Sequence, residues 1–434
     1  MTEPISDSEI DGRVARLQGT LAESGLSAVI CFGAHRDYCP ADIRYLARWS
    51  CTDEEQSFVF VPSEGPSVLV TDAEWDVARA RMEARAGEIL LDRSPAHTLA
   101  RLVADHTTAG DRVGVSGFPM FPAPVYLTLV EACPGVTFVD ATSPVATLRL
   151  VKSPAEVALL REAARVSDLG MRAGLDRIHE GGSEFEVAAA AEHAIRANGG
   201  ELSFVTVMGA GPRTADATFF PTERPLQRGD LAVLDCGARI HGYHGDMCRT
   251  VVVGAAVDDR KRVMLEAVAA GVRAATDAAR PGARVRDVTA AAEREARGAG
   301  FGGQWWGYYM PHGTGTGQHE APDTHTDGDL RLAPGMVMCV EPGIAVPGTG
   351  DPRTDDPRHA GRRGDAQPAT ARVVGSRLTS GYYARTPTSS SACRCTLAMA
   401  SAASSTPSRP ARNTASFRYT ACCSPAASAT GKCI

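Results

Sequence analysis

Short apolar runs separated by turns dominate the first third of the chain, and they predict a sheet with helices packed against it. One run ends at Gly33, and two others flank a turn at Glu64 and Gly65, which is typical of a hairpin. We predict strands at 26–32, 58–62, 68–70, 112–115 and 136–140, and helices at about 10–24 and about 73–86. Residues 1–148 are therefore expected to form an α/β domain.

Two helix starts follow this domain. Ser153 precedes Pro154 and Glu156, and Ser183 precedes Glu186, and both patterns are typical of a capping box. Apolar residues continue the first of these helices at helical spacing. We therefore place the boundary between two domains near residue 148.

An internal repeat lies in the second domain. Residues 186–192 match residues 287–293 at an offset of 101 residues. Two alanine-rich helices can agree by chance. Because strand-like segments follow both copies, we favour a duplicated α/β half, with each half adding strands to one sheet.

Composition excludes several classes of protein. The chain has 434 residues, 44% of them hydrophobic, and a formal net charge of −6. This length has room for two or three domains, and the charge gives no electrostatic basis for binding nucleic acid. There is no 18-residue apolar run, and the acidic N-terminus is unlike a signal peptide, so we expect no membrane span and a cytoplasmic location. Twelve cysteines without a Cys-x-x-Cys pattern indicate reduced thiols.

Charge is distributed unevenly along the chain. Residues 358–434 hold eleven basic residues and one acid, Asp365, so residues 1–357 hold 34 basic and 50 acidic residues, a net charge of −16. The same last segment carries five of the twelve cysteines and is rich in Ser, Thr, Ala and Pro. Its composition differs from that of the rest of the chain.

Carboxylates and histidines recur at the ends of apolar segments. Asp235 ends one apolar strand, and Asp246 precedes the next, so neighbouring arms would bring them close; solvated turn aspartates are the alternative. His312 and His319 lie in a glycine-rich loop, and Glu341 lies in an apolar run at 336–344 that we predict to be one buried strand. Such a set of oxygen and nitrogen donors suits two divalent cations.

Taken together, these segments resemble the creatinase/aminopeptidase P/methionine aminopeptidase family, the metallopeptidases with the pita-bread fold. The resemblance covers residues 10 to about 356. It rests on Asp235-Cys236-Gly237, Gly242-Tyr243, Asp246, Arg249-Thr250, His312-Gly313-Thr314-Gly315, His319-Glu320-Ala321-Pro322 and Glu341-Pro342-Gly343. It implies an α/β (α+β) chain with a creatinase-like N-terminal domain followed by a duplicated pita-bread catalytic domain.

The resemblance also implies a role for each site residue. Asp235 would bind one metal ion, Asp246 would bridge both ions and His312 would bind the second. Glu341 would be a ligand that also orients or deprotonates the attacking water, and His319 would contact the substrate carbonyl or the oxyanion that develops from it. Manganese is the expected metal, with cobalt, iron and zinc as alternatives.

Three positions depart from the family pattern. The fifth ligand should be a Glu fourteen residues after Glu341, but that position holds the shorter Asp355. Thr218 or Phe219 stands where proline-specific members carry a histidine, and Tyr308 stands where aminopeptidase P members tend to have another. These differences favour a C–N hydrolase or lyase acting on a small amino-acid derivative as an alternative to Xaa-Pro peptidase activity.

After residue 356 the family's usual continuation is missing. Read one base later, codons for residues 358–366 can encode Val-Thr-Pro-Asp-Gly-Ala-Glu-Thr, which resembles that continuation. We therefore hypothesise a frameshift near residues 350–357; a natural basic, disordered tail is the alternative. The expected organisation is an N-terminal domain at 1–148, a catalytic domain at 149–357 and an irregular or out-of-frame tail at 358–434.

The sequence therefore predicts a metal-dependent hydrolase of the Xaa-Pro peptidase/creatinase type, which uses a hydroxide shared by two metal ions to cleave a peptide or amide C–N bond. The substrate would be a small peptide or amino-acid derivative, and the protein would be a homodimer without nucleic-acid or membrane partners. A different class, a non-catalytic pita-bread binding module or a product inactivated by loss of its last strand, is the further alternative.

Overall fold

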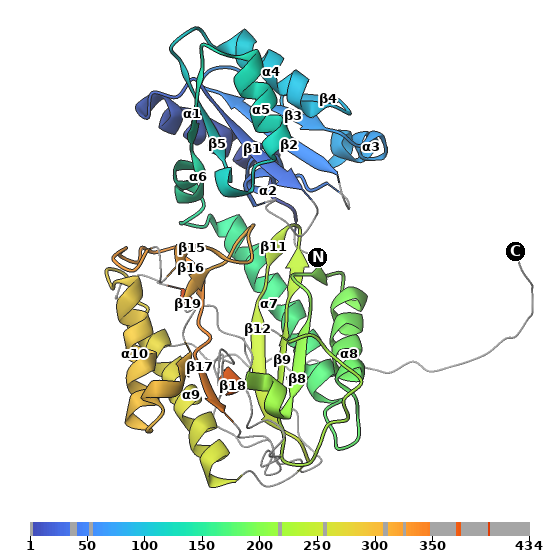
Figure 1. Cartoon of the computed structure of the whole chain (residues 1–434), viewed down its shortest axis with the longest axis vertical. Helices are drawn as coiled ribbons and strands as arrows, with labels where there is room; N and C mark the ends of the chain where they lie inside the picture. The colour runs from blue at the N-terminus through green and yellow to red at the C-terminus, as the bar shows by residue number, and fades with distance from the viewer. Residues whose placement is uncertain are drawn as a thin grey trace, which may run out of the picture. The chain divides into compact units, whose positions relative to one another are not determined.

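The computed structural model describes most of the chain before residue 348 and little after it (Figure 1). The described residues are 3–34, 41–51, 55–215, 219–254, 258–306, 311–323, 327–347, 370–374 and 398–399. Three positions singled out from the sequence, Thr218, Tyr308 and Asp355, lie outside these ranges. No helix among the described residues is both long enough and apolar enough to cross a membrane.

The N-terminal domain is built on a six-stranded sheet with the order β4-β3-β2-β1-β5-β6. Its strands are β1 (Ala28–Ala34), β2 (Gln56–Pro62), β3 (Val68–Thr71), β4 (Glu88–Leu91), β5 (Arg112–Ser116) and β6 (Thr137–Asp140). The first three strands pair antiparallel, and β4, β5 and β6 each pair parallel with a neighbour. The predicted hairpin around Gly65 is confirmed.

Helices cover both faces of this sheet. They are α1 (Asp7–Glu23), α2 (Ala41–Ala47), α3 (Glu74–Glu83), α4 (Pro95–His106), α5 (Ala123–Ala132) and α6 (Thr142–Leu148), with a short turn η1 (Phe118–Met120). Alternate residues of β1 point to opposite faces, so Val29 and Cys31 pack with α1, α3 and α6, whereas Ile30 and Phe32 pack with α4 and α5. The sheet thus lies between two layers of helices, and the predicted α/β character of this domain is confirmed.

The first half of the catalytic domain begins with two helices whose starts match the prediction. The hydroxyl of Ser153 and that of Ser183 each accept a hydrogen bond from the backbone N–H of a glutamate three residues on. Each serine's own backbone N–H donates to the carboxylate of that glutamate, so both capping boxes are confirmed. The elements are α7 (Pro154–Leu175), α8 (Glu184–Ala197), β7 (Glu201–Leu202), β8 (Val207–Ala210), η2 (Gly211–Ala215), β9 (Leu231–Cys236), β10 (Ala238–Ile240), β11 (Tyr243–His244) and β12 (Met247–Val252).

The second half repeats this plan. Its elements are α9 (Asp259–Ala278), α10 (Val285–Gly298), η3 (Gly302–Gln304), β13 (Trp305–Trp306), β14 (His312–Gly313), β15 (Glu320–Asp323), β16 (Val337–Cys339), β17 (Gly343–Pro347), β18 (Thr370–Val374) and β19 (Ala398–Met399). Helix α10 follows α8 by 101 residues at both ends, and in Figure 1 the strands lie between the two helix pairs. The predicted duplication is confirmed.

Two details of the prediction are wrong. The described strands of the two halves form separate hydrogen-bonded sheets rather than one, because β9 pairs with β8 and β12 while β17 pairs with β13 and β18. The run at 336–344 is also not one strand: β16 pairs with β14 and β17 belongs to another sheet. Pro342 has no N–H to donate to a ladder, and the chain changes sheets there.

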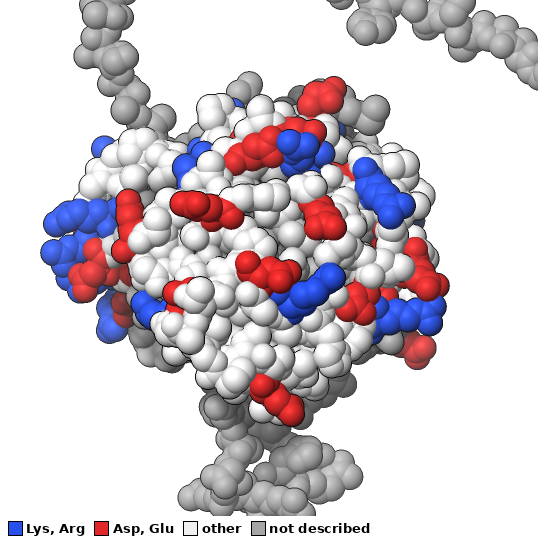
Figure 2. All heavy atoms as spheres, turned by 90° about the horizontal axis from the view of Figure 1, so that it is seen from above, with Lys and Arg blue, Asp and Glu red and all other residues white. Residues whose placement is uncertain are grey.

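Charge on the face shown in Figure 2 is mixed. Acidic and basic side chains are interspersed over the described residues of this face, without an extended area of one sign. A nucleic-acid surface is typically a continuous basic stripe. The visible face therefore has no such stripe among its described residues.

Candidate metal centre

Four ionisable side chains converge in the catalytic domain: Asp246, His312, His319 and Glu341, here called the metal cluster. One ligand atom from each lies within 4.8 Å of the others. Asp246 directly precedes β12 in the first half, and the other three residues come from β14, the segment before β15 and the break between β16 and β17. The cluster thus joins the two halves of the duplication.

Close packing against α7 positions Asp246. A Cβ atom added to the preceding Gly245 would lie 2.6 Å from Ser167 Oγ and 2.9 Å from the carbonyl oxygen of Ala163, both on α7. Gly245 also donates its N–H to the carbonyl of Ala238 at 2.8 Å. Only glycine allows this approach of the backbone to the helix, and the approach directs the next residue toward the cluster.

His312 is fully buried and its two ring nitrogens have different surroundings. Nδ1 lies 2.9 Å from the carbonyl oxygen of Gly313 and donates to it, so this nitrogen carries a proton. Nε2 lies 2.7 Å from Glu341 Oε1 and 3.9 Å from Asp246 Oδ2. Burial opposes a charged ring, but the hydrogen bond and charge of Glu341 raise the pKa of His312 to about 9.

The carboxylates of the metal cluster repel each other. Burial and the charge of Glu341 raise the pKa of Asp246 to about 7, although His312 and a hydrogen bond from Gln318 Nε2 at 3.3 Å act in the opposite direction. Two buried carboxylates facing one imidazole nitrogen need a positive charge between them. A proton on His312 Nε2 would supply it, and a divalent cation fits the same donor set, since Nε2 is the nitrogen that Gly313 leaves available.

His319 is the solvent-exposed member of the metal cluster. It is exposed, and its ring meets that of His312 edge to face, with 4.2 Å between the ring centroids and 82° between the planes. Desolvation and the neighbouring charge of His312 lower the pKa of His319 from its ordinary value. A neutral ring at the rim can donate an N–H to a substrate oxygen.

The other residues singled out from the sequence are not among these four. Asp235 is in β9, in register with Cys248 of β12, and is not one of the four residues of the metal cluster. Phe219 is buried and packs with Val233 and Cys248, so it is a core residue. The predicted fifth ligand, Asp355, lies outside the described residues.

Two neighbours of His319 carry contacts that the sequence did not predict. Gln318 donates to Asp246, and Glu320 is a buried carboxylate that accepts from Lys152 and Arg149. Burial by itself would raise the pKa of Glu320, but the charges of Lys152 and Arg149 hold it below its ordinary value. Lys152 was visible at the domain boundary, but nothing in its local pattern connected it with residue 320.

Comparison with known proteins assigns both domains. The model of metallopeptidase family M24 matches residues 158–365, and that of the creatinase/prolidase N-terminal domain matches residues 13–151. The probable dipeptidase PepE of Mycobacterium tuberculosis is 30% identical over 367 residues, which cover 79% of this chain and 90% of PepE. The putative dipeptidase YkvY of Bacillus subtilis is 33% identical over 220 residues, 50% of this chain and only 60% of YkvY.

A solved structure has the same fold. The Xaa-Pro dipeptidase from Bacillus anthracis aligns with a TM-score of 0.69 and 26% identity, over 79% of this chain and 92% of that one. The predicted architecture, a creatinase-like N-terminal domain followed by a pita-bread domain, is confirmed by these matches.

Proposed function

The chain belongs to metallopeptidase family M24, and from this premise we propose that it is a metal-dependent peptidase that hydrolyses short Xaa-Pro peptides. The observation that carries the proposal is the metal cluster, in which two carboxylates and an imidazole nitrogen face one point from both halves of the duplicated domain. The names of its relatives, which include a probable dipeptidase and an Xaa-Pro dipeptidase, support a small peptide as the substrate.

In this proposal Asp246, His312 and Glu341 hold the metal, together with Asp235 and Asp355. Manganese is the proposed metal, and cobalt, iron or zinc would suit the same oxygen and nitrogen donors. When bound, two divalent ions would lower the pKa of water and polarise the peptide carbonyl. The Nδ1 hydrogen bond of His312 to Gly313 supports its role, because it fixes the ring with Nε2 toward the carboxylates.

The remaining work falls to side chains of the metal cluster. A carboxylate oxygen of Glu341 would accept the proton of the attacking water and pass it to the leaving amine. His319 would donate its N–H to the carbonyl oxygen of the scissile bond and stabilise the negative charge that develops there. Its neutral ring and its place at the exposed edge of the cluster support this role.

A second candidate is a C–N hydrolase or lyase acting on a small amino-acid derivative. The burial of Phe219 in an apolar cluster favours it, because no polar contact to a peptide comes from that position. Reaction in ¹⁸O-labelled water identifies a lyase, since a hydrolase incorporates one labelled oxygen in its product and a lyase incorporates none. Activity on Ala-Pro then separates the peptidase from a C–N hydrolase of a small amino-acid derivative.

We also propose a homodimer in the cytoplasm. Exposed apolar side chains at the β4 edge of the N-terminal sheet support self-association: Trp75 is 71% exposed, Met82 78% and Leu91 42%. Sedimentation equilibrium measures the mass directly. Replacing Trp75 and Met82 by Gln should then shift a dimer to monomer, and an unchanged mass would exclude this edge as the interface.

The experiment that tests the proposed function combines metal content with activity. The full chain is stripped with a chelator and reloaded with Mn²⁺, and about two ions per chain with hydrolysis of Ala-Pro are expected. His312→Ala should lose both, whereas His97→Ala, which changes an exposed histidine on α4, should lose neither. A second protein carrying the frame-corrected C-terminus is measured in parallel. If neither protein binds metal, the proposed function is wrong.

A further inference from the structure

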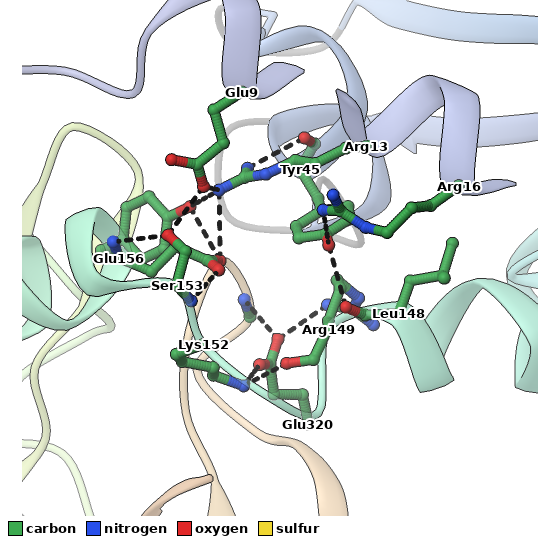
Figure 3. Close-up of polar contacts among 12 residues, drawn as sticks. Glu9, Arg13, Arg16, Tyr45, Leu148, Arg149, Lys152, Ser153, Glu156 and Glu320 are labelled. Carbon is green, nitrogen blue, oxygen red and sulfur yellow. Dashed lines mark hydrogen bonds and ion pairs between the residues drawn. The ribbon is translucent and has the colours of Figure 1, made fainter. Parts of the chain in front are cut away.

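Glu320, the residue after His319, is not part of the metal cluster and lies in a second buried group of charges (Figure 3). Only 2% of its side chain is exposed. Oε1 accepts from Lys152 Nζ at 2.5 Å, and Oε2 accepts from Arg149 Nη1 at 2.7 Å and from the backbone N–H of Gly317 at 3.1 Å. Both oxygens of the carboxylate are therefore fixed by hydrogen bonds, and one of these bonds comes from the backbone of its own loop.

The partners of Glu320 lead to the N-terminal domain. Arg149 and Lys152 belong to the short connection between α6 and α7, and Lys152 Nζ also donates to the carbonyl of Arg149 at 2.5 Å. Arg149 Nε lies 3.2 Å from Oδ1 of Asp42 on α2, whose other oxygen accepts from Ser116 Oγ. We call Asp42, Arg149, Lys152 and Glu320 the anchor cluster. It holds two acids and two bases, so its charges balance.

The glycines of the loop are matched to this carboxylate. A Cβ atom added to Gly315 would overlap Glu320 Oε1, and one added to Gly317 would lie 3.3 Å from Oε2 and 3.4 Å from Ala41 Cβ of α2. Because Lys152 and Arg149 fix the carboxylate, it cannot swing aside as a free side chain would. Position 315 thus has room for Glu320 only while it lacks a side chain, and a side chain at position 317 would fit tightly.

The backbone of the loop is held from its other side as well. The backbone N–H of His244 donates to the carbonyl of Gly315 at 2.9 Å. Arg44 Nη1 of α2 donates to the carbonyl of Thr316 at 3.3 Å. His319 lies in the sequence between Gly317 and Glu320, and the backbone N–H of Gly317 donates to the Glu320 carboxylate. Both of its flanks are fixed, although its own ring is exposed.

We propose that Glu320 is a positioning residue: through Lys152 and Arg149 it fixes the loop that holds the His319 ring against His312. Asp42 extends this support into the N-terminal domain, so docking of that domain contributes to the geometry of the site. The expected effect on catalysis rests on the proposed peptidase function, whereas the effect on the loop does not depend on it.

Charge balance dictates the variants. Glu320→Gln alone leaves two buried cations facing one acid and is expected to destabilise the chain. The double variant Glu320→Gln with Lys152→Met leaves Asp42 paired with Arg149 and restores the balance. Gly315→Ala keeps every charge but pushes against the carboxylate, so it tests the same contact by another route.

Glu156→Gln is the matched control. Glu156 is equally buried and also contacts the N-terminal domain, with Arg13 Nη2 3.4 Å away and the hydroxyl of Tyr243 donating to it at 3.1 Å (Figure 3). Its hydrogen bonds join Ser153 and Tyr243 rather than the loop at 313–320. A general loss of domain contact would therefore affect this variant as well.

Two measurements on the full Mn²⁺-treated chain decide the proposal. Hydrogen exchange followed by mass spectrometry reports the amides of residues 313–320, and kinetics on Ala-Pro separates kcat from KM. In the double variant and in Gly315→Ala, exchange of the loop should rise about tenfold and kcat should fall about 10- to 100-fold with a smaller change in KM. The control should change neither.

The outcomes are distinct. If folded Glu320→Gln/Lys152→Met or Gly315→Ala retains wild-type loop exchange, the proposal is overturned. Wild-type kcat in either folded variant overturns it as well. If Glu320 only stabilised the fold, kcat would return to the wild-type value once stability is restored. If the wild-type chain neither binds Mn²⁺ nor cleaves Ala-Pro, the proposed function fails, and the exchange data alone decide whether Glu320 anchors the loop.

Discussion

Two buried groups of charges meet at neighbouring residues of one loop, and they are balanced in opposite ways. In the anchor cluster, the cations of Lys152 and Arg149 hold the pKa of Glu320 below its ordinary value despite burial. In the metal cluster, burial and the charge of Glu341 raise the pKa of Asp246 to about 7. The chain supplies the counter-charges of the first group itself, whereas the second is suited to a cation from outside.

The difference separates structure from function. A buried carboxylate with its own cations gains nothing from an added ion, so it can be used to fix backbone. Buried carboxylates facing a histidine bind whatever cation is available, a proton or a metal ion. The predictions below test this contrast, starting with the largest expected effect.

The largest effect on activity should come from removing a donor of the metal cluster. A metal ion at 100 times its Kd stabilises the folded state by about 2.7 kcal/mol. His312→Ala should lose this stabilisation together with hydrolytic activity, because Nε2 faces both carboxylates. Urea unfolding with and without Mn²⁺ measures it. A variant still stabilised by Mn²⁺ to the wild-type extent would mean that His312 is not a ligand.

Breaking the anchor cluster should cost stability whether or not metal is present. Glu320→Gln leaves Lys152, with a side chain only 1% exposed, and Arg149 short of a negative partner, which typically costs about 3–5 kcal/mol. Adding Lys152→Met should recover most of this loss. Urea unfolding of both variants without metal provides the measurement. An equal loss in the single and the double variant would contradict the charge-balance argument.

Truncating His319 should affect the rate and leave stability unchanged. His319→Ala removes an exposed ring that we propose donates to the developing oxyanion, and loss of one such donor typically lowers kcat on the order of 10²- to 10³-fold. Steady-state kinetics on Ala-Pro measures this, with Mn²⁺ content as the control. A variant with normal metal content and normal kcat would exclude the assigned role.

The metal-free protein should lose stability as the pH rises. The pKa of Asp246 is raised from 3.8 to about 7 and that of His312 from 6.5 to about 9, so the folded state binds protons more tightly than the unfolded state over both intervals. The stabilisation from His312 is complete below pH 6.5 and is lost as pH rises through about 9. Urea unfolding at pH 6, 7.5 and 9 after chelation should show a steady decrease.

The affinity for Mn²⁺ should increase as the pH rises over the same range, because Mn²⁺ competes with the protons on Asp246 and His312. Titration calorimetry in buffers of different ionisation enthalpy measures the protons released. Proton release of zero at pH 7.5 would show that neither group is protonated in the metal-free chain.

The smallest effect is expected for an exposed ion pair. Arg172 Nε donates to Asp168 Oδ2 at 2.8 Å across one turn of α7, but the two side chains are 44% and 19% exposed. Asp168→Asn should cost no more than about 0.5 kcal/mol. A loss as large as that of Glu320→Gln would show that burial does not explain the contrast between clusters.

Local signals in the sequence predicted much of the architecture. The serines at 153 and 183 start helices because their side chains satisfy free backbone N–H groups within the same turn, and this needs no tertiary contact. The apolar run at 26–32 likewise predicted a buried strand, although only the structure shows which of its residues face each helix layer. The break between β16 and β17 escaped prediction, because the apolar pattern does not show which ladder each part of the segment joins.

The candidate site was predicted less evenly. Asp246, His312, His319 and Glu341 were found by their motifs, and the structure brings them together. Gln318 and Glu320 lie in the same motif. The partner of Gln318 is Asp246, 72 residues away, and the partners of Glu320 are Arg149 and Lys152 at the domain boundary, about 170 residues away. Spacing along the chain carries no information about such contacts, since only the folded backbone brings these residues together.

The amino-acid sequence by itself predicted α1, α3, α7 and α8, the strands of the N-terminal sheet other than β4, the duplication and the residue types of the metal cluster, because each depends on nearby residues or on motif identity. Only the tertiary structure decided which carboxylate is balanced by the chain and which faces other carboxylates. Glu320, at the start of β15, and Glu341, just before β17, are both buried acids. The charge that reaches each one depends on distant segments, and that charge sets their different roles.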